Sequence, residues 1–464
     1  MIDRSAAEIA EQVRSGEVAA VDVVSAHLER IRAFEPQLNS FITVAEDAAL
    51  EQAARVDELV ALGKDPGPLA GVPFSVKDTY DTAGMRTTYG STIFDDNVPS
   101  ESYAPVERLI NAGGVLVGKT NTPEFAVFIR TVNKLMGECR NAWDRRRIAG
   151  GSSGGAAASV AMGLTPIALG SDGGGSVRIP AALNGVFGLM PSRGRLPRSR
   201  HGISTRNFSA AGPITRFPRD LQLMLDVMTQ ANADDPLSRG ICPPVLPTRR
   251  GHVRGIRWIE RNGMVKCDAR VSRIVKTAAA NLADELSVDL IDDGSSLPSK
   301  EYTDLFYAMM KADRLASGGG ELLDSPFSDQ LTDYARHHLR GAREVSGAEY
   351  SRGLEAQFHA TDAIFSLLEE DLIVATPTVQ ITAPLIPRGV QPLPEDARAS
   401  FVANTFLMNF TGFPAVTIPC GHIDGLPVGL QLVSVPFDEE RLIELAEHVC
   451  LKAPSPSMIK GEMP

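Results

Sequence analysis

The sequence predicts an α/β fold: one large domain with a central, mixed but mostly parallel twisted sheet, covered by helices on both faces. The chain has 464 residues, 43% of them hydrophobic, which is enough to bury a large core. From residue 69 onward, short apolar runs typical of strands alternate with helical stretches, a pattern that favours parallel strands. No linker cleanly divides the chain, so we expect a single domain covering residues 1–464.

An N-terminal helical arm is expected over residues 1–65. Ser5 and Glu8 form a capping box, and apolar residues keep helical spacing up to about residue 60. Three further segments follow, and they are expected to hold the core motifs (66–220), a variable helical region without recognisable chemistry (221–375), and the last core strands with a helix (376–452).

The core elements are expected at short apolar runs bounded by glycine, proline or polar residues. The expected strands are Phe74–Val76, Val115–Val117, Pro166–Leu169, Val186–Leu189, Leu372–Ala375, Val416–Pro419 and Val428–Val433. The helices expected among the first four strands are Ala104–Ala112, Ala156–Met162 and Val177–Leu183.

Charge and cysteine usage narrow the class of protein. The 46 Lys and Arg against 57 Asp and Glu give a net charge of −11, which argues against a nucleic-acid-binding surface. The five cysteines are scattered and form no C-x-x-C pair, which indicates a reducing compartment without a disulfide framework or zinc site. Neither a signal peptide nor an apolar membrane span is found. We expect a cytoplasmic protein without metal or cofactor, with a homodimer as one option for its assembly.

Two short motifs match known patterns but lack the expected surroundings. GGVLVGKT, Gly113–Thr120, matches a phosphate-binding loop, yet its variable positions Val115–Val117 favour a strand. GGSSG, Gly150–Gly154, matches the nucleophile elbow of α/β-hydrolases around Ser152. An elbow needs a preceding strand and a later histidine, whereas Asp144–Arg147 is a poor strand. An α/β-hydrolase-like esterase stays an alternative.

Ser176 has a better context for a nucleophile. A plausible strand, the turn Ser171–Gly175 and the start of a helix place it at a helix N-terminus, where free N–H groups favour negative charge. Three consecutive glycines, Gly173, Gly174 and Gly175, let several N–H groups point inward, as an oxyanion hole requires. A structural glycine turn, or an anion site without chemistry, is the alternative.

A serine nucleophile needs a base, and Lys77 is the candidate. It closes the apolar run GVPFSVKD, so it can point into a buried cleft. A free lysine has a pKa of about 10.4 and is no base at neutral pH, but burial can lower that pKa by several units. An ordinary surface lysine is the alternative.

Several long motifs, in order along the chain, resemble those of the amidase signature family. They are VPFSVKD around Lys77, GKTNTPEFA (118–126), GGSSGG (150–155), SDGGGSVRIPA (171–181), GLMPSRGR (188–195), NFTGFPAVTIPCG (409–421) and GLPVGLQL (425–432). The resemblance covers nearly the whole chain and is weakest across residues 235–370.

The resemblance implies a Ser–cis-Ser–Lys triad. Ser176 would be the nucleophile, Ser152 the bridging serine on a cis peptide after Gly151, and Lys77 the neutral base. The same resemblance implies oxyanion donors at Gly173, Gly174, Gly175 and Ser176. It also implies supporting roles for Ser153, Asp172 and Arg178, the last as a brace for Asp172. Ala126 and Val127 are candidate substrate-binding residues.

These roles imply a serine hydrolase that cleaves C–N bonds of small-molecule amides or carbamates (urethanes) through an acyl-enzyme. The family includes aryl acylamidases, nylon-oligomer hydrolases and carbamate-cleaving enzymes. The alternative is the glutaminase subunit of a tRNA-dependent amidotransferase. Residues 400–411 hold no charged side chain, which argues against glutamine binding there. The arginine-rich segment 193–206 is either a solvated loop or a mobile lid.

Overall fold

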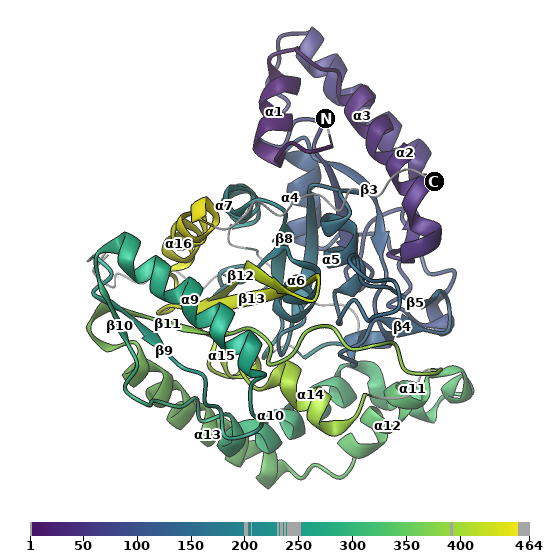
Figure 1. Cartoon of the computed structure of the whole chain (residues 1–464). Helices are drawn as coiled ribbons and strands as arrows, with labels where there is room; N and C mark the ends of the chain where they lie inside the picture. Colours follow the sequence, from purple (N-terminus) through teal and green to yellow (C-terminus); the bar gives the residue numbers. More distant parts are fainter. Residues whose placement is uncertain are drawn as a thin grey trace.

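A computed structural model describes residues 2–198, 203–205, 207–229, 232, 235, 238, 252–389 and 393–452. Its centre is one eleven-stranded mixed sheet that draws strands from the whole length of the chain (Figure 1). In spatial order the strands are β1 (Phe41–Val44), β3 (Val115–Thr120), β2 (Pro73–Lys77), β6 (Ile167–Asp172), β8 (Ala210–Thr215), β7 (Phe187–Met190), β12 (Ala415–Ile423), β13 (Leu426–Val433), β11 (Leu372–Pro377), β9 (Gly255–Trp258) and β10 (Asp289–Ile291). A separate small pair joins β4 (Val132–Asn133) to β5 (Gly137–Glu138).

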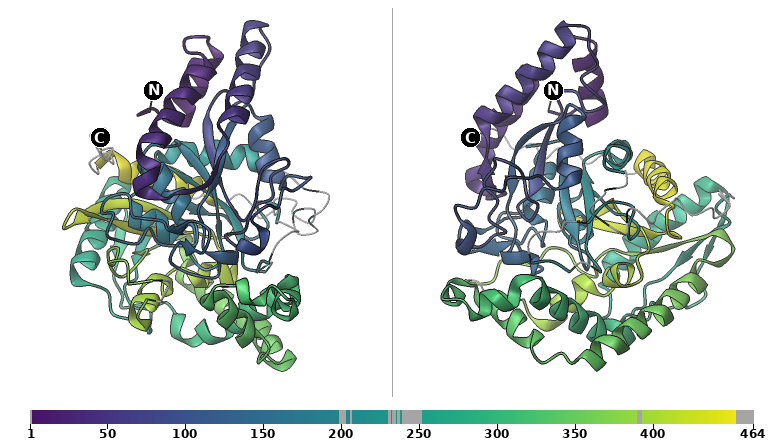
Figure 2. Two further views of the ribbon diagram at one scale, coloured as in Figure 1. Left: turned by 90° about the vertical axis from the view of Figure 1, so that its right-hand side faces the viewer. Right: turned by 180° about the vertical axis from the view of Figure 1, so that it is seen from behind.

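Helices flank this sheet, and the first three project from it as the arm seen in Figures 1 and 2. The capping box at Ser5 and Glu8 is present at the start of α1, as the sequence predicts. The α-helices are α1 (Ala6–Arg14), α2 (Ala20–Leu38), α3 (Glu46–Ala61), α4 (Ala104–Asn111), α5 (Gly154–Ala161), α6 (Arg178–Asn184), α7 (Pro218–Met228), α9 (Ala269–Leu286), α10 (Ser299–Arg314), α11 (Gly320–Asp324), α12 (Asp333–Ala342), α13 (Gly347–Leu367), α14 (Glu395–Val402), α15 (Phe406–Thr411) and α16 (Glu439–Lys452). None of the helices in the described ranges is both long and apolar enough to cross a bilayer.

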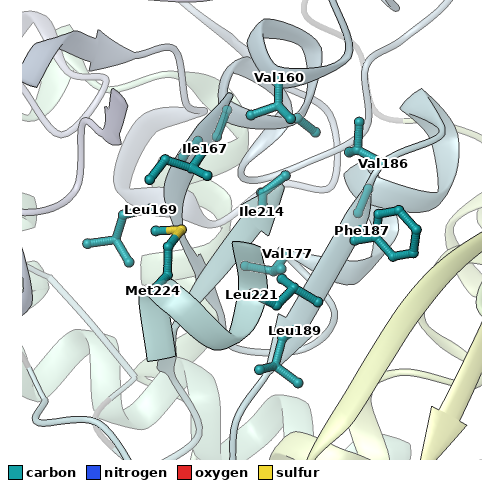
Figure 3. Close-up of a cluster of buried hydrophobic side chains, with 14 of the residues drawn as sticks. Val160, Ile167, Leu169, Val177, Val186, Phe187, Leu189, Ile214, Leu221 and Met224 are labelled. Carbon is teal, nitrogen blue, oxygen red and sulfur yellow. The ribbon is translucent and has the colours of Figure 1, made fainter. Parts of the chain in front are cut away.

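The two faces of the sheet belong to different hydrophobic clusters, because neighbouring strand residues point to opposite sides. Leu189 and Val416 pack in the cluster that also holds residues of α7, α9 and α16. Their neighbours Met190 and Ala415 pack in the cluster built with α10, α13 and α15. Figure 3 shows part of the first cluster, where Leu221 and Met224 of α7 lie beside strand residues such as Ile214. The single mixed sheet with helices on both faces is confirmed.

The prediction that most strands are parallel is wrong. Among the described strands of the large sheet, six neighbouring pairs are antiparallel and four are parallel. The parallel pairs include β2 with β3 and with β6, where the strand–helix alternation is regular. Elsewhere β8 runs back between β6 and β7, and β12 returns as β13 through Asp424 and Gly425. Both turn residues have positive φ, so this Asp-Gly pair was an available hairpin signal.

Four strands of the sheet lie where the sequence analysis expected none. β1 lies inside the helical arm, and β9 and β10 lie inside the variable region 221–375. β8 is interrupted in sequence by Gly212 and Pro213, which lower the strand signal although both residues pair with β6. The seven expected strands are all present, as are the helices expected within the first half of the sheet.

Candidate active site

Two neighbouring parallel strands end side by side and bring the candidate base to two serines. Phe74 of β2 pairs with Ile167 of β6, so the carboxyl ends of both strands lie at the same sheet edge. Lys77 is the last residue of β2 and is completely buried. Its Nζ lies 2.6 Å from the Oγ of Ser152 and 2.8 Å from the Oγ of Ser171. The side chain therefore faces hydroxyl groups and not bulk water.

The environment of Lys77 favours its neutral form. Burial lowers the pKa of Lys77 well below its ordinary value; the Asp172 carboxylate opposes the shift and the Arg314 guanidinium adds to it. No carboxylate in the described ranges lies within 4 Å of Nζ. A neutral amine keeps a lone pair, so it can accept a proton from a hydroxyl placed at 2.6 Å.

Ser152 is held in a tight loop before α5. The peptide bond between Gly151 and Ser152 is cis, as the resemblance implies. A side chain at Gly151 would meet the backbone of Ile129 and Arg130 at 2.7 and 2.8 Å, so only glycine fits there. The loop carries Ser152 to the end of β2 without the strand that a nucleophile elbow requires.

Ser153 and Asp172 brace the loop around these groups. Ser153 Oγ donates to the Ser171 carbonyl at 3.1 Å and accepts from the Ser171 N–H at 3.2 Å, which ties the two serine loops together. Arg178 donates from Nε and Nη2 to the two carboxylate oxygens of Asp172, each at 3.0 Å. Burial alone would raise the pKa of Asp172, but the Arg178 charge and the hydrogen bonds from Arg178, Asn409 and the Gly175 N–H together bring the pKa to about 2.

The glycine loop after β6 offers backbone donors to the pocket. In the described part of the chain, no acceptor is recorded for the N–H groups of Gly173, Gly174 and Ser176. The N–H of Gly175 is different, because it donates to Asp172 Oδ1 at 2.6 Å. The assignment of Gly175 as an oxyanion donor is therefore corrected: its N–H is already used to hold the loop. The geometry leaves Gly173, Gly174 and Ser176 as candidate donors.

A cavity of about 150 Å³ opens over Ser152, Ser171 and Ser176. Ala126 and Val127 line it, in keeping with the sequence analysis. The Ser176 hydroxyl has no hydrogen-bond partner among the described residues, so it is open to this cavity. Much of the remaining wall is aromatic or polar without negative charge, and its side chains include those of Tyr80, Tyr103, Phe125, Phe128, Phe306, Tyr307, Met310, Arg314 and His338.

Sequence reasoning missed two kinds of pocket residue. Ser171, the second partner of Lys77, was read only as part of a turn, although it ends the strand next to Lys77. Helix α10 supplies Phe306, Met310 and Arg314 from the region in which no chemistry was recognised. Their place at the pocket depends on how α10 packs against α15, which no local motif reveals.

The other candidate motifs serve structure. Val115–Thr120 is the buried strand β3, and Lys119 within it donates to the Tyr80 carbonyl and the Thr87 hydroxyl at 2.6 and 2.7 Å. His422 on β12, a histidine late in the sheet, packs against the ring of Trp143 and does not line the cavity. Within the arginine-rich segment 193–206, residues 199–202 and 206 lie outside the described ranges. The alternatives of a lid and a solvated loop therefore stay predictions.

Comparison with known proteins adds to this geometry. The family model described as Amidase matches residues 22–443. A glutamyl-tRNA(Gln) amidotransferase subunit from Carboxydothermus hydrogenoformans is 34% identical over 470 residues, covering 95% of this chain and 96% of its own. Among solved structures, a bacterial aryl acylamidase of the amidase signature family has a TM-score of 0.88 at 27% identity, covering 97% and 96% of the two chains. A 6-aminohexanoate cyclic dimer hydrolase has a TM-score of 0.86 at 27% identity, covering 98% of each.

Proposed function

The chain belongs to the amidase signature family, and from that premise we propose that it hydrolyses the C–N bond of small linear amides or carbamates. Ser176 is the proposed nucleophile, Ser152 the bridging hydroxyl and Lys77 the base. The observation that supports this best is the buried Lys77 amine, 2.6 Å from Ser152 Oγ and without a neighbouring carboxylate within 4 Å in the described ranges.

The proposed reaction begins with attack of Ser176 Oγ on the substrate carbonyl carbon. The Ser176 proton passes to Ser152 Oγ as the Ser152 proton passes to the neutral Lys77 amine. The carbonyl π electrons move to oxygen, and the N–H groups of Gly173, Gly174 and Ser176 stabilise that oxyanion. The tetrahedral intermediate then collapses and the C–N bond breaks.

The leaving nitrogen needs a proton, because an amine anion is a very poor leaving group. The lysinium returns its proton to Ser152, which in turn gives its own proton to that nitrogen, so that the amine leaves neutral. Water then attacks the acyl-enzyme by the same relay and releases the acid and free Ser176. These steps use groups of this chain only and consume no cofactor.

The pocket wall supports a substrate with an apolar or aromatic part. Phe125, Phe128 and Phe306 line the cavity together with Tyr80, which stacks on Tyr103 at 4.4 Å between ring centroids. Aromatic rings favour flat, apolar groups next to the scissile bond. Anilides and aryl carbamates fit this description.

A second candidate, glutamine hydrolysis within an amidotransferase, is favoured by the 34% identity to a glutamyl-tRNA(Gln) amidotransferase subunit. Free glutamine carries an ammonium group, which a buried site has to pair with an acceptor or a carboxylate. No Asp or Glu lines the described part of the cavity, and Val402 lies in its wall. This charge pattern disfavours glutamine and leads us to rank the free-standing hydrolase first.

The test is a substrate panel on the purified chain alone: 4-nitroanilides, alkyl N-(4-nitrophenyl)carbamates and glutamine, the last with and without ATP. We expect release of 4-nitroaniline from the anilides and the carbamates without any added protein, and no such release by Ser176→Ala. Ammonia release from glutamine alone, with anilides and carbamates untouched, would transfer the assignment to the second candidate.

A further inference from the structure

Arg314 is a buried cation without an acidic group within 4 Å in the described ranges. The residue is 6% exposed and lines the same cavity as Ser152 and Ser176. Nη1 lies 3.1 Å from His338 Nε2, Nη2 donates weakly to the Ala126 carbonyl at 3.3 Å, and Nε has no partner. The buried Arg178, by contrast, is paired with Asp172. An arginine this buried is rarely left without a counter-charge.

His338 does not supply that counter-charge. A guanidinium can only donate hydrogen bonds, so His338 Nε2 accepts and the ring is neutral. Burial lowers the pKa of His338 well below its ordinary value, and Arg314 adds to that shift. One oxygen of the adjacent Asp313 accepts from Tyr350 at 2.8 Å, and the Asp313 carboxylate acts on Arg314 only through space, where it opposes the lowering of the Arg314 pKa by burial. The histidine therefore orients the guanidinium and leaves it without an ion-pair partner.

The rest of the described pocket adds no negative charge. Its lining contains no Asp or Glu, and the second arginine in the wall, Arg198, is paired with Asp235 at 3.2 Å. With Lys77 neutral, the substrate meets the charge of Arg314 in a largely apolar cavity. In such a site a charged hydrogen-bond donor favours an anionic group of matching shape.

The helix places this charge at a defined distance from the reacting centre. Phe306, Met310 and Arg314 are four residues apart, so they lie along one face of α10. Met310 lies beside the oxyanion loop, since its Cε would be 3.9 Å from a Cβ placed on Gly173. Arg314 is one turn, about 6 Å, further along the helix.

We propose that Arg314 is a specificity-determining residue that binds a carboxylate of the substrate. The preferred substrates are then amides that bear a carboxylate, on the acyl chain or on the amine side of the scissile bond. This inference rests on the proposed amide hydrolysis and names the substrate class for it. The guanidinium forms two parallel hydrogen bonds to the carboxylate, a geometry that a lysine cannot reproduce.

The experiment compares matched substrates that differ in one carboxylate: the mono-4-nitroanilides of succinic and glutaric acid against those of butanoic and pentanoic acid. Assays are run on the alkaline plateau, so that Lys77 is neutral in every variant. We expect the wild type to favour the acidic substrates by about 10-fold to 100-fold in kcat/KM, as for a hydrogen-bonded ion pair in a pocket. A second pair, butanoyl-4-aminobenzoate against butanoyl-4-toluidine, places the charge on the amine side.

Arg314→Met should remove most of this preference, because the lost interaction is specific to the anion. Arg314→Lys should keep part of the preference. Arg340→Met is the matched control: it removes a positive charge from the exposed side of α12, outside the cavity, and should keep the full preference. If Arg314→Met does not fold, the preference for acidic substrates is measured in Arg314→Lys and Arg314→Gln instead.

Equal rates on charged and neutral substrates by the wild type, or a preference that survives in Arg314→Met, would overturn the inference while leaving amide hydrolysis intact. If no anilide is cleaved at all, the proposed function fails instead. Binding then still tests the subsite: Ser176→Ala should bind the glutaric mono-anilide more tightly than the pentanoic anilide by calorimetry. Equal affinities there would also count against Arg314.

Discussion

Lys77 and Lys119 are both fully buried near the ends of adjacent parallel strands, yet their surroundings differ. Lys119 Nζ lies 3.6 Å from the Asp78 carboxylate and donates to the Tyr80 carbonyl and the Thr87 hydroxyl. Lys77 Nζ contacts only the hydroxyls of Ser152 and Ser171 among the described side chains. One lysine is held as part of an ion pair, and the other is surrounded by groups that exchange protons.

The comparison shows that burial alone does not make a lysine a base. Burial lowers the pKa of Lys119 to about 8, where Asp78 opposes any larger shift. Burial lowers the pKa of Lys77 well below its ordinary value; the Asp172 carboxylate opposes this shift and the Arg314 guanidinium adds to it. The absence of an adjacent carboxylate, and the presence of a hydroxyl in its place, distinguish the candidate catalytic lysine from the structural one.

The largest effect should come from Lys77→Met. It removes the proton acceptor, so we expect kcat/KM for a 4-nitroanilide to fall roughly 10³-fold to 10⁴-fold, as for loss of a positioned general base. Thermal unfolding should show a folded protein of at least wild-type stability, because a buried amine is replaced by an apolar side chain of similar length. Retention of more than a tenth of the activity would remove Lys77 from the relay.

The next largest effect is expected in the pH dependence of kcat/KM, which reports the pKa of Lys77 and not that of Lys119. The active form needs Lys77 neutral, so kcat/KM should rise tenfold per pH unit below the Lys77 pKa and level off above it. A lysine with its ordinary pKa would place the midpoint near 10.5, and we expect it well below that value. Because the Arg314 charge helps to lower this pKa, Arg314→Met should move the midpoint to higher pH. A midpoint at the ordinary value in the wild type would contradict a base lowered by burial.

Removing one partner of the Lys119–Asp78 ion pair should lower the stability of the fold. Lys119→Met leaves Asp78 buried without its cation, and we expect a loss of about 3 kcal/mol in the free energy of unfolding, as for one partner of a buried pair. Adding Asp78→Asn should recover most of that loss in urea titrations. If the double variant is no more stable than Lys119→Met alone, the pair does not account for the burial of Lys119.

The smallest effect is expected at the second hydroxyl around Lys77. Ser171→Ala removes the 2.8 Å contact that orients Nζ but keeps the contact to Ser152. We expect kcat to fall about 5-fold to 10-fold with little change in KM, the size of one neutral hydrogen bond. Ser153→Ala serves as the comparison, because it loosens the same loop without touching the lysine. A loss as large as that of Lys77→Met would make Ser171 a member of the relay itself.

The core of the fold and the three residues of the proposed relay could be predicted from sequence, for different reasons. β2, β3 and β6 follow from strand–helix alternation, which fixes the neighbours of Lys77. The cis peptide before Ser152 was implied by resemblance alone, since no spacing rule indicates it.

What could not be predicted depends on contacts between distant segments. Its place in the glycine run predicts Gly175 as an oxyanion donor. In the fold its N–H donates to the Asp172 carboxylate, which Arg178 also holds. Arg314 lies in a stretch with no motif, and only the packing of α10 on the core makes it part of the pocket. The antiparallel return of β8 was hidden by Gly212 and Pro213, which weaken its strand signal.

The brace between Asp172 and Arg178 also links the proposed relay to segments that are made much later in synthesis. Arg178 donates to Gln431 on β13 and to Asn409 on α15, more than 200 positions later in the sequence. A chain still emerging from the ribosome would already contain every serine of the relay but none of these anchors. The proposed relay would thus gain this brace only once residues 409 and 431 have been made and folded, so a shorter nascent chain would hold the serines without it.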